Sequence, residues 1–256
     1  MHTLQQMYSY LDRLIPGELS CEWDNDGLMV CPDKHAEVKK VLLTLDVTAK
    51  AIEYAVDEGF DTIVSHHPLI FKPLKNLSGD DPVSARVMTL VKNGISVLSF
   101  HTRLDALDGG VNDSLAELLG LEDVEMLPGD PDMIGRIGSL DYPCDFSEFV
   151  NKVKDELGSP FVNVIDAQLD VSRVALCAGD GKDLLKAAFE AGADTYLTGT
   201  LSYNAMVDAA ELPMNIIEAG HFHTENHVLY MLADLIEELD SDIETEIYES
   251  NPISSI

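Results

Sequence analysis

Gly59-Phe-Asp-Thr-Ile-Val-Ser-His66-His67-Pro68 is the most informative stretch of the chain. Its apolar run at residues 62–64 predicts a buried strand that ends at two adjacent histidines and a proline. Neighbouring side chains of a strand point to opposite faces, but a turn near Pro68 lets both imidazoles converge. Imidazole is the commonest metal ligand, so the pair predicts a metal site. Two unrelated surface histidines are the alternative interpretation.

The segments around this stretch alternate between strands and helices. Residues 41–46 predict a strand and residues 48–58 a helix, and the histidine-bearing strand follows after a short connection. A helix over residues 82–93 then leads to a strand over residues 94–100, which ends at His101. Strand, helix and strand joined in this way predict parallel βαβ units.

The second half of the chain repeats this order. Residues 173–179, 192–198 and 214–221 align with residues 40–46, 59–65 and 95–101, and the middle pair shares Gly, Asp and Thr at the same offsets. The sequence therefore predicts an α/β protein built from two duplicated α/β domains with βαβ units. Turn-forming residues at 127–132 suggest a first domain over 1–127 and a second over 128–256, either separate or interlinked.

The charge balance is strongly acidic. The chain has 46 Asp and Glu against 16 Lys and Arg, a formal net charge of −30. Such a chain repels nucleic acid and anionic membranes, so neither is an expected partner. The acidic residues are dispersed and form no tail, and salt screens their repulsion, because the Debye length is about 3 Å at 1 M. We therefore expect a halophilic protein.

Other bulk features favour a cytoplasmic location. No apolar run approaches the roughly 20 residues that span a bilayer, and the first residues lack the layout of a signal peptide. The four cysteines are scattered without a CxxC pair, so they are expected to be small buried side chains and not disulfides or zinc ligands: Cys21, Cys31, Cys144 and Cys177.

Two predicted strand ends carry the same short pattern of an imidazole and a carboxylate four residues apart. The first is His101 with Asp105, and the second is His221 with Glu225. Together with the histidine pair they place four imidazoles and two carboxylates at carboxyl ends of strands, the edge where open α/β sheets bind ligands. This set suits two borderline divalent metals that keep open positions.

Four motifs then carry a resemblance to a known family. They are residues 23–28, WDNDGL, residues 65–69, SHHPL, residues 101–105, HTRLD, and residues 220–225, GHFHTE. In this order they resemble the signatures of the GTP cyclohydrolase I type 2 homolog family, also called the Nif-three-like dinuclear-metal-centre hexameric family. The resemblance implies a Nif-three-like fold and a toroidal homohexamer. It also implies a site for two divalent metal ions, among which zinc, iron, manganese and nickel are not distinguished. The residues that line this site are His66, His67, His101, Asp105, His221 and Glu225. Either Asp105 or Glu225 is expected to bridge the metals.

Some neighbouring residues are less certain members of this site. Thr200 and Asn204 stand where the family more often has an acidic residue and a histidine, which puts catalytic activity in doubt. His223, inside the last motif, and His227, two residues after it, are candidates for supporting roles. Asp46, at the end of its strand, is another such candidate, although a solvated carboxylate is the plainer interpretation. Residues 22–28 are expected to form a turn anchored by a buried tryptophan.

Three functions remain open on the sequence alone, and no catalytic base is assigned. The family name implies a metal-dependent hydrolase acting on a nucleotide such as GTP. The alternatives are a dimetal phosphoesterase and a non-enzymatic metal-holding ring. The basic residues nearest the motifs are Lys72, Lys75 and Arg103, and this scarcity weighs mildly against a triphosphate substrate.

Overall fold

A five-stranded sheet forms the centre of the first of two units in the computed structural model, which describes residues 2–253. Its strand order is β13-β4-β5-β6-β2. The three inner strands are parallel, β13 is parallel to β4, and β2 is an antiparallel edge. These strands are β2 (Gly27–Val30), β4 (Lys40–Thr44), β5 (Thr62–Ser65), β6 (Ser96–Ser99) and β13 (Glu244–Tyr248). A small antiparallel pair, β1 (His2–Thr3) and β3 (Glu37–Val38), lies outside this sheet.

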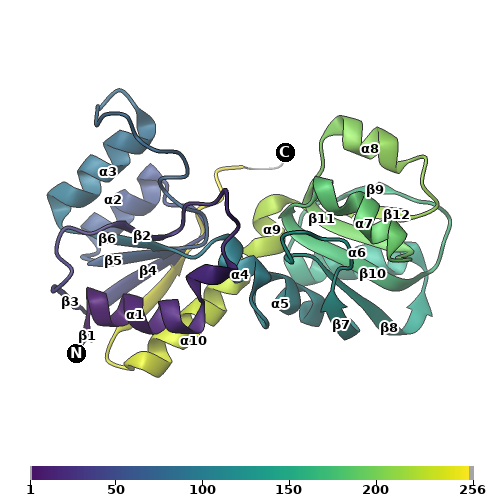
Figure 1. The fold of residues 1–256 in the computed structure, drawn as a ribbon, viewed down its shortest axis with the longest axis horizontal. Coiled ribbons are helices and arrows are strands. Elements are labelled where there is room, and N and C mark those ends of the chain that lie inside the picture. The colour runs from purple at the N-terminus through teal and green to yellow at the C-terminus, as the bar shows by residue number, and fades with distance from the viewer. Residues whose placement is uncertain (1, 254–256) are drawn as a thin grey trace. The chain divides into compact units, whose positions relative to one another are not determined.

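Helices cover both faces of this sheet. Helices α2 (Ala49–Asp57) and α3 (Pro82–Asn93) lie on one face, and α1 (Leu4–Leu14) and α10 (Val228–Leu239) lie on the other (Figure 1). The core beneath α2 and α3 joins buried side chains of the three inner strands to those of the two helices: Leu42, Ile63, Val97, Ile52, Ala55, Val87 and Leu90. A short 3-10 turn, η1 (Gly17–Leu19), follows α1.

Local sequence signals set the limits of α3. The side chain of Asp81 accepts a hydrogen bond from the backbone N–H of Ser84 at 2.7 Å, and Pro82 occupies the first turn. Gly94 ends the helix in the left-handed conformation with φ of 71°, which only glycine adopts at little cost. The helix therefore delivers the chain directly into β6, and from there to His101.

The second unit contains a six-stranded mixed sheet of order β7-β8-β10-β11-β12-β9. Its strands are β7 (Glu122–Met126), β8 (Arg136–Cys144), β9 (Asn163–Ile165), β10 (Val171–Asp180), β11 (Thr195–Thr200) and β12 (Asn215–Glu218). Its helical segments are α5 (Val111–Leu118), α6 (Phe146–Leu157), η2 (Lys182–Leu184), α7 (Leu185–Glu190), α8 (Tyr203–Ala209) and α9 (His221–Glu225).

The predicted internal repeat is present in the strand registers. In the first unit Val41 lies opposite Thr62. In the second unit Val174 lies opposite Thr195. These are the positions that the sequence alignment pairs. In each unit three parallel strands run side by side in chain order, so the prediction of duplicated α/β domains is confirmed.

The shared Asp of the repeat has the same structural role twice. One carboxylate oxygen of Asp61 accepts hydrogen bonds from the backbone N–H groups of residues 39 and 40 at 2.8 and 3.1 Å. Asp194 does the same for residues 172 and 173 at 3.0 and 2.8 Å. Each Asp thereby ties the start of one parallel strand to the start of the next.

The division of the chain differs from the predicted halves 1–127 and 128–256. The first unit takes residues up to Leu104 and those from Leu229 onward, and the second runs from Asp105 to Val228. The reason is that β13 returns to pair with β4, with Glu244 opposite Lys40. The chain leaves the first unit within α4 (Thr102–Ala106), and the turn at 127–132 lies inside the second unit.

Two further sequence expectations meet the structure here. None of the helices in residues 2–253 combines the length and apolar composition that a membrane crossing needs. Cys21 and Cys177 are buried as expected, whereas Cys31 is exposed and Cys144 is half-buried.

Candidate metal centre

Three histidines converge in the first unit where two adjacent parallel strands end. His66 and His67 directly follow β5, and His101 comes two residues after β6. The ring centroids of His66, His67 and His101 are separated by 5.0, 5.3 and 5.6 Å. One ligand atom from each residue lies within 4.8 Å of the other two. The predicted turn after β5 therefore brings the adjacent imidazoles together, and His101 joins them.

Hydrogen bonds hold the Nδ1 atom of every ring in this cluster. His66 is fully buried, and its Nδ1 donates to the backbone carbonyl of Phe100 at 2.9 Å. Nδ1 of His67 lies 2.9 Å from a carboxylate oxygen of Asp46, and Nδ1 of His101 lies 2.8 Å from one of Asp24. Because each partner is an acceptor, Nδ1 carries the proton and Nε2 keeps the lone pair that a metal needs.

The side chain of Asp24 is 0% exposed, whereas that of Asp46 is 43% exposed. The second oxygen of Asp24 accepts hydrogen bonds from the backbone N–H of Thr102 at 3.1 Å and from the Thr102 hydroxyl at 2.6 Å. Burial raises the pKa of this carboxyl, but the bonds from His101 and Thr102 outweigh it and lower the pKa to about 2. Asp24 is therefore a fixed negative charge directly behind His101.

The turn that carries Asp24 differs from the prediction in one respect. Trp23 was expected to anchor the turn from inside, but its side chain is 56% exposed and lies edge-on to His101. The turn is anchored by the Asp24 carboxylate, which accepts hydrogen bonds from His101 and Thr102. The indole of Trp23 remains exposed to solvent. The expectation of a buried tryptophan was wrong, and the loop borders the histidine cluster.

Arg103 lies close to this cluster in sequence but is fully occupied. Its guanidinium donates to both oxygens of Asp26 at 2.9 and 2.7 Å, to Asp12 at 2.8 Å and to the carbonyl of Ile15 at 3.2 Å. Burial lowers the pKa of Arg103, but these carboxylates raise it above the ordinary value. Arg103 is 5% exposed and stabilises the fold, so it is not available to hold a phosphate.

The second unit contains the other His–carboxylate pair. His221 and Glu225 lie one turn apart on α9, with Nε2 of His221 3.1 Å from a carboxylate oxygen of Glu225. The hydroxyl of Thr200, a position that departs from the family pattern, lies 3.5 Å from Nδ1 of His221. Asp105 belongs to this unit and is buried, at 9% exposed.

Buried contacts fix α9 against the ends of β10 and β11. The hydroxyl of Thr224 accepts a hydrogen bond from the backbone N–H of Gly179 at 3.1 Å. A Cβ at Gly199 would lie 2.5 Å from that hydroxyl, and a Cβ at Gly179 would overlap the carboxylate of Glu225. Only glycine allows the carboxylate so close to the strand backbone, so Gly179 and Gly199 help to set the position of Glu225.

The remaining candidates have identifiable partners. Asp46, offered as a supporting residue or a solvated one, is partly exposed and lies beside His67. Nδ1 of His223 contacts the carbonyl of Leu157 at 3.3 Å, and Nε2 of His227 contacts the carbonyl of Val111 at 3.1 Å. His227 lies between α9 and α10 and belongs to neither helix.

The donor set fits a borderline divalent metal. Neutral imidazoles with carboxylates nearby are the ligands that zinc, iron, manganese and nickel accept in proteins, and thiolates take no part here. Three imidazoles whose tautomers are set by outer hydrogen bonds are typical of prepared metal ligands. The structure brings His66, His67 and His101 together in the first unit, and His221 and Glu225 together in the second.

Fold and site together define an α/β protein with a histidine cluster at strand ends whose donor atoms suit a metal ion. The chain matches the Duf34/NIF3 (NGG1p interacting factor 3) family over residues 2–254 and belongs to that family. A relative named GTP cyclohydrolase 1 type 2 homolog, from Clostridium perfringens, is 33% identical over 247 residues, covering 94% of both chains. The family resemblance seen in the sequence is therefore confirmed.

Solved structures confirm the fold class. Reduced HcgD from Methanocaldococcus jannaschii is similar with a TM-score of 0.85 and 29% identity, covering 96% of this chain and 97% of that one. A Bacillus cereus protein related to NIF3 has a TM-score of 0.88 over 100% of both chains, at 22% identity. The second likeness bears on the fold alone.

Proposed function

We propose that the chain binds two divalent metal ions through the six residues that the sequence singled out. They are His66, His67, His101, Asp105, His221 and Glu225. The observation that carries this proposal is the set of three Nδ1 hydrogen bonds, which leaves Nε2 of each first-unit histidine as a ligand atom. The family membership and the paired His221 and Glu225 support a second metal. The bridging carboxylate is Asp105 or Glu225.

The proposed activity is that of a metal-dependent hydrolase acting on a nucleotide such as GTP. The relatives' name, GTP cyclohydrolase 1 type 2 homolog, suggests the substrate class. Bound divalent metals supply a Lewis acid and activate water near neutral pH. The chain itself orients the imidazoles through Phe100, Asp46 and Asp24.

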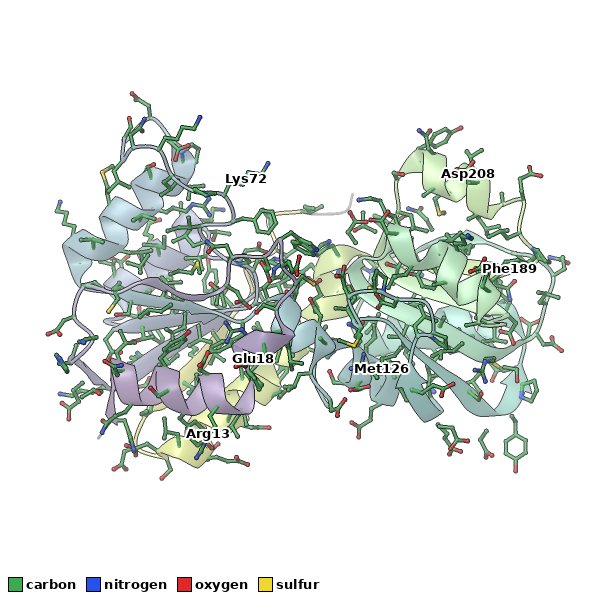
Figure 2. The ribbon with its side chains drawn as sticks, viewed as in Figure 1. Arg13, Glu18, Lys72, Met126, Phe189 and Asp208 are labelled. Atoms are coloured by element: carbon green, nitrogen blue, oxygen red, sulfur yellow. The ribbon has the colours of Figure 1, made fainter. Side chains whose placement is uncertain are left out.

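A second candidate is a dimetal phosphoesterase, and a third is a metal-holding ring without catalysis. The guanidinium of Arg103 is already bound by carboxylates, which favours these two candidates over an enzyme that binds the triphosphate of GTP. Of the three basic residues near the motifs, Lys72 and Lys75 remain exposed, and Lys72 extends from the loop after the histidine pair (Figure 2). Two exposed lysines are expected to bind a triphosphate only weakly.

A substrate screen separates these candidates. Protein purified in molar salt is loaded in turn with zinc, manganese, iron or nickel and incubated with GTP, other nucleotides and simple phosphoesters. We expect metal-dependent consumption of GTP with addition of water, lost in His101→Ala. Release of phosphate from esters without a change to the base favours the phosphoesterase, and no turnover with any metal favours the non-enzymatic ring.

We also propose a toroidal homohexamer in a salt-rich cytoplasm, with a small-molecule substrate and no nucleic acid partner. The family resemblance supports the ring, and closed rings need self-consistent contacts. The net charge of −30 supports the exclusion of nucleic acid. Light scattering in high salt tests the assembly, because a mass near that of one 28.0 kDa chain contradicts the ring.

A further inference from the structure

Two large aromatic side chains beside the histidine cluster are exposed. Trp23 is 56% exposed and Phe71 is 43% exposed. Their ring centroids lie 6.1 Å apart, and each ring lies edge-on to His101, at 6.3 and 6.2 Å. All three rings belong to the first unit. An apolar surface next to metal ligands marks a binding site more often than chance exposure does.

Hydrogen bonds of adjacent residues hold both rings in place. Asp24, next to Trp23, is fixed by His101 and Thr102. The side-chain amide of Asn25 donates to the carbonyl of Ile70, the residue before Phe71, and so joins the two loops. The rings therefore stand on a constrained backbone, and rigid aromatic rings supply contact area at a small cost in conformational entropy.

The charges around this aromatic pair indicate what it can recognise. Arg103 is occupied by Asp12 and Asp26, which leaves Lys72 and Lys75 as the exposed basic residues closest in sequence. In a chain with a net charge of −30, these two give little attraction for a polyanion. Flat aromatic faces instead favour a planar ring, because every such ring has a π-face that can stack.

We propose that Trp23 and Phe71, whose rings are inclined at 70° to each other, form a stacking platform for a planar heteroaromatic ring of the nucleobase class, next to the metal-binding imidazoles. One of the two side chains stacks on the face of that ring, and the other contacts its edge. Recognition is by the ring, with the phosphates of a nucleotide contributing little. This inference deepens the proposed function and rests on it for the role of the metal, but stacking itself requires only these two side chains.

The chain offers a direct probe, because Trp23 is its only tryptophan. Its fluorescence is followed while the protein, with and without bound zinc, is titrated with guanosine, ribose 5-phosphate or inorganic tripolyphosphate. Free N-acetyltryptophanamide corrects for absorption by the ligand. We expect saturable quenching by guanosine and none by ribose 5-phosphate or tripolyphosphate.

Variants connect the signal to the platform. Phe71→Ala is expected to weaken guanosine binding by about five-fold or more, the loss that removing one stacking contact produces. Phe161→Ala is the matched control, because Phe161 is 57% exposed but belongs to the second unit, and it should leave binding unchanged. Metal content should be equal in all three proteins.

The outcomes separate this inference from the proposed function. Saturable ring binding by a protein that takes up no zinc overturns the metal site and keeps the platform. Zinc uptake without quenching by guanosine, or equal affinities of the wild type and Phe71→Ala, overturns the platform and keeps the metal site. Tryptophan emission that shifts with protein concentration and follows self-association identifies a second copy as the occupant, which also overturns the platform.

Discussion

The carboxylate of Asp24 accepts a hydrogen bond from Nδ1 of His101 across 2.8 Å, although the two residues are 77 positions apart in sequence. Asp24 also binds the backbone and hydroxyl of Thr102, so one buried side chain fixes both the imidazole and the start of α4. The turn at residues 23–26 thereby borders the histidine cluster. Its acidic residue holds Nδ1 of His101, and its exposed aromatic residue lies edge-on to the same imidazole.

Replacing Asp24 tests this relationship. In Asp24→Asn the side-chain amide can donate to Nδ1, which favours the tautomer that protonates Nε2 and blocks the ligand atom. We expect metal affinity to fall about 10- to 100-fold, as for the loss of other outer hydrogen bonds to metal ligands. Isothermal titration calorimetry with zinc measures this affinity. Asp57→Asn, an exposed substitution on α2, should leave the affinity unchanged; equal affinities in both variants contradict the assignment.

Arg103 provides a test of stability. Arg103→Ala leaves the buried Asp26 without the guanidinium that contacts both of its oxygens. Removing one member of a buried ion pair lowers the free energy of unfolding by about 3–5 kcal/mol. Arg103→Lys should lose less, because a lysine keeps the charge but not the fork geometry. Urea denaturation measures the free energy of unfolding. The exposed Arg13→Ala should change it by no more than about 0.5 kcal/mol, and a similar small effect of Arg103→Ala would refute the structural role.

Thr224 is expected to position α9. Thr224→Val removes the hydroxyl that accepts from the Gly179 N–H, which costs about 1–3 kcal/mol for an unsatisfied buried donor. The same change should weaken metal binding, because Glu225 is the next residue. Thr224→Ser keeps the hydroxyl and should restore metal affinity even if it lowers stability slightly. If Thr224→Ser and Thr224→Val bind metal equally poorly, the hydroxyl has no positioning role.

Salt dependence follows from the net charge of −30. Lowering salt from 1 M to 0.1 M lengthens the Debye length from about 3 Å to about 10 Å, so repulsion among surface carboxylates grows. We expect the melting temperature to fall as salt drops below about 0.5 M, measured by differential scanning calorimetry in potassium chloride. A melting temperature that is constant from low to molar salt contradicts a halophilic protein.

Local patterns and the repeat were sufficient to predict most of the fold. The shared Gly, Asp and Thr of the two halves were visible in the sequence. The structure explains why Asp recurs, because Asp61 and Asp194 accept equivalent backbone hydrogen bonds in the two units. The helix over residues 82–93 was predicted at its observed limits because its proline start and glycine end are strong local signals. The histidine pair was recognisable because a proline follows it.

Long-range pairing could not be predicted in the same way. Asp24 meets His101 only after the sheet brings distant loops together, and the expectation that Trp23 anchors its turn from inside was wrong. The return of β13 to β4 has no local signature either, because its pairing with β4 joins residues about 200 positions apart, such as Glu244 and Lys40. Similarly, Arg103 is one of the basic residues nearest the motifs, but the sequence does not show that Asp12 and Asp26 bind its guanidinium.

Metal content measures most directly whether the oriented histidines hold metal. Untagged protein purified in molar salt without chelator is examined by inductively coupled plasma mass spectrometry, beside His66→Ala, His101→Ala and the outlying His35→Ala. We predict about two divalent ions per chain in the wild type and in His35→Ala, as the donor set of a dinuclear site requires, and a clear loss in the other two. Wild-type protein that carries no metal and takes up none after incubation with zinc, manganese, iron or nickel would contradict the account.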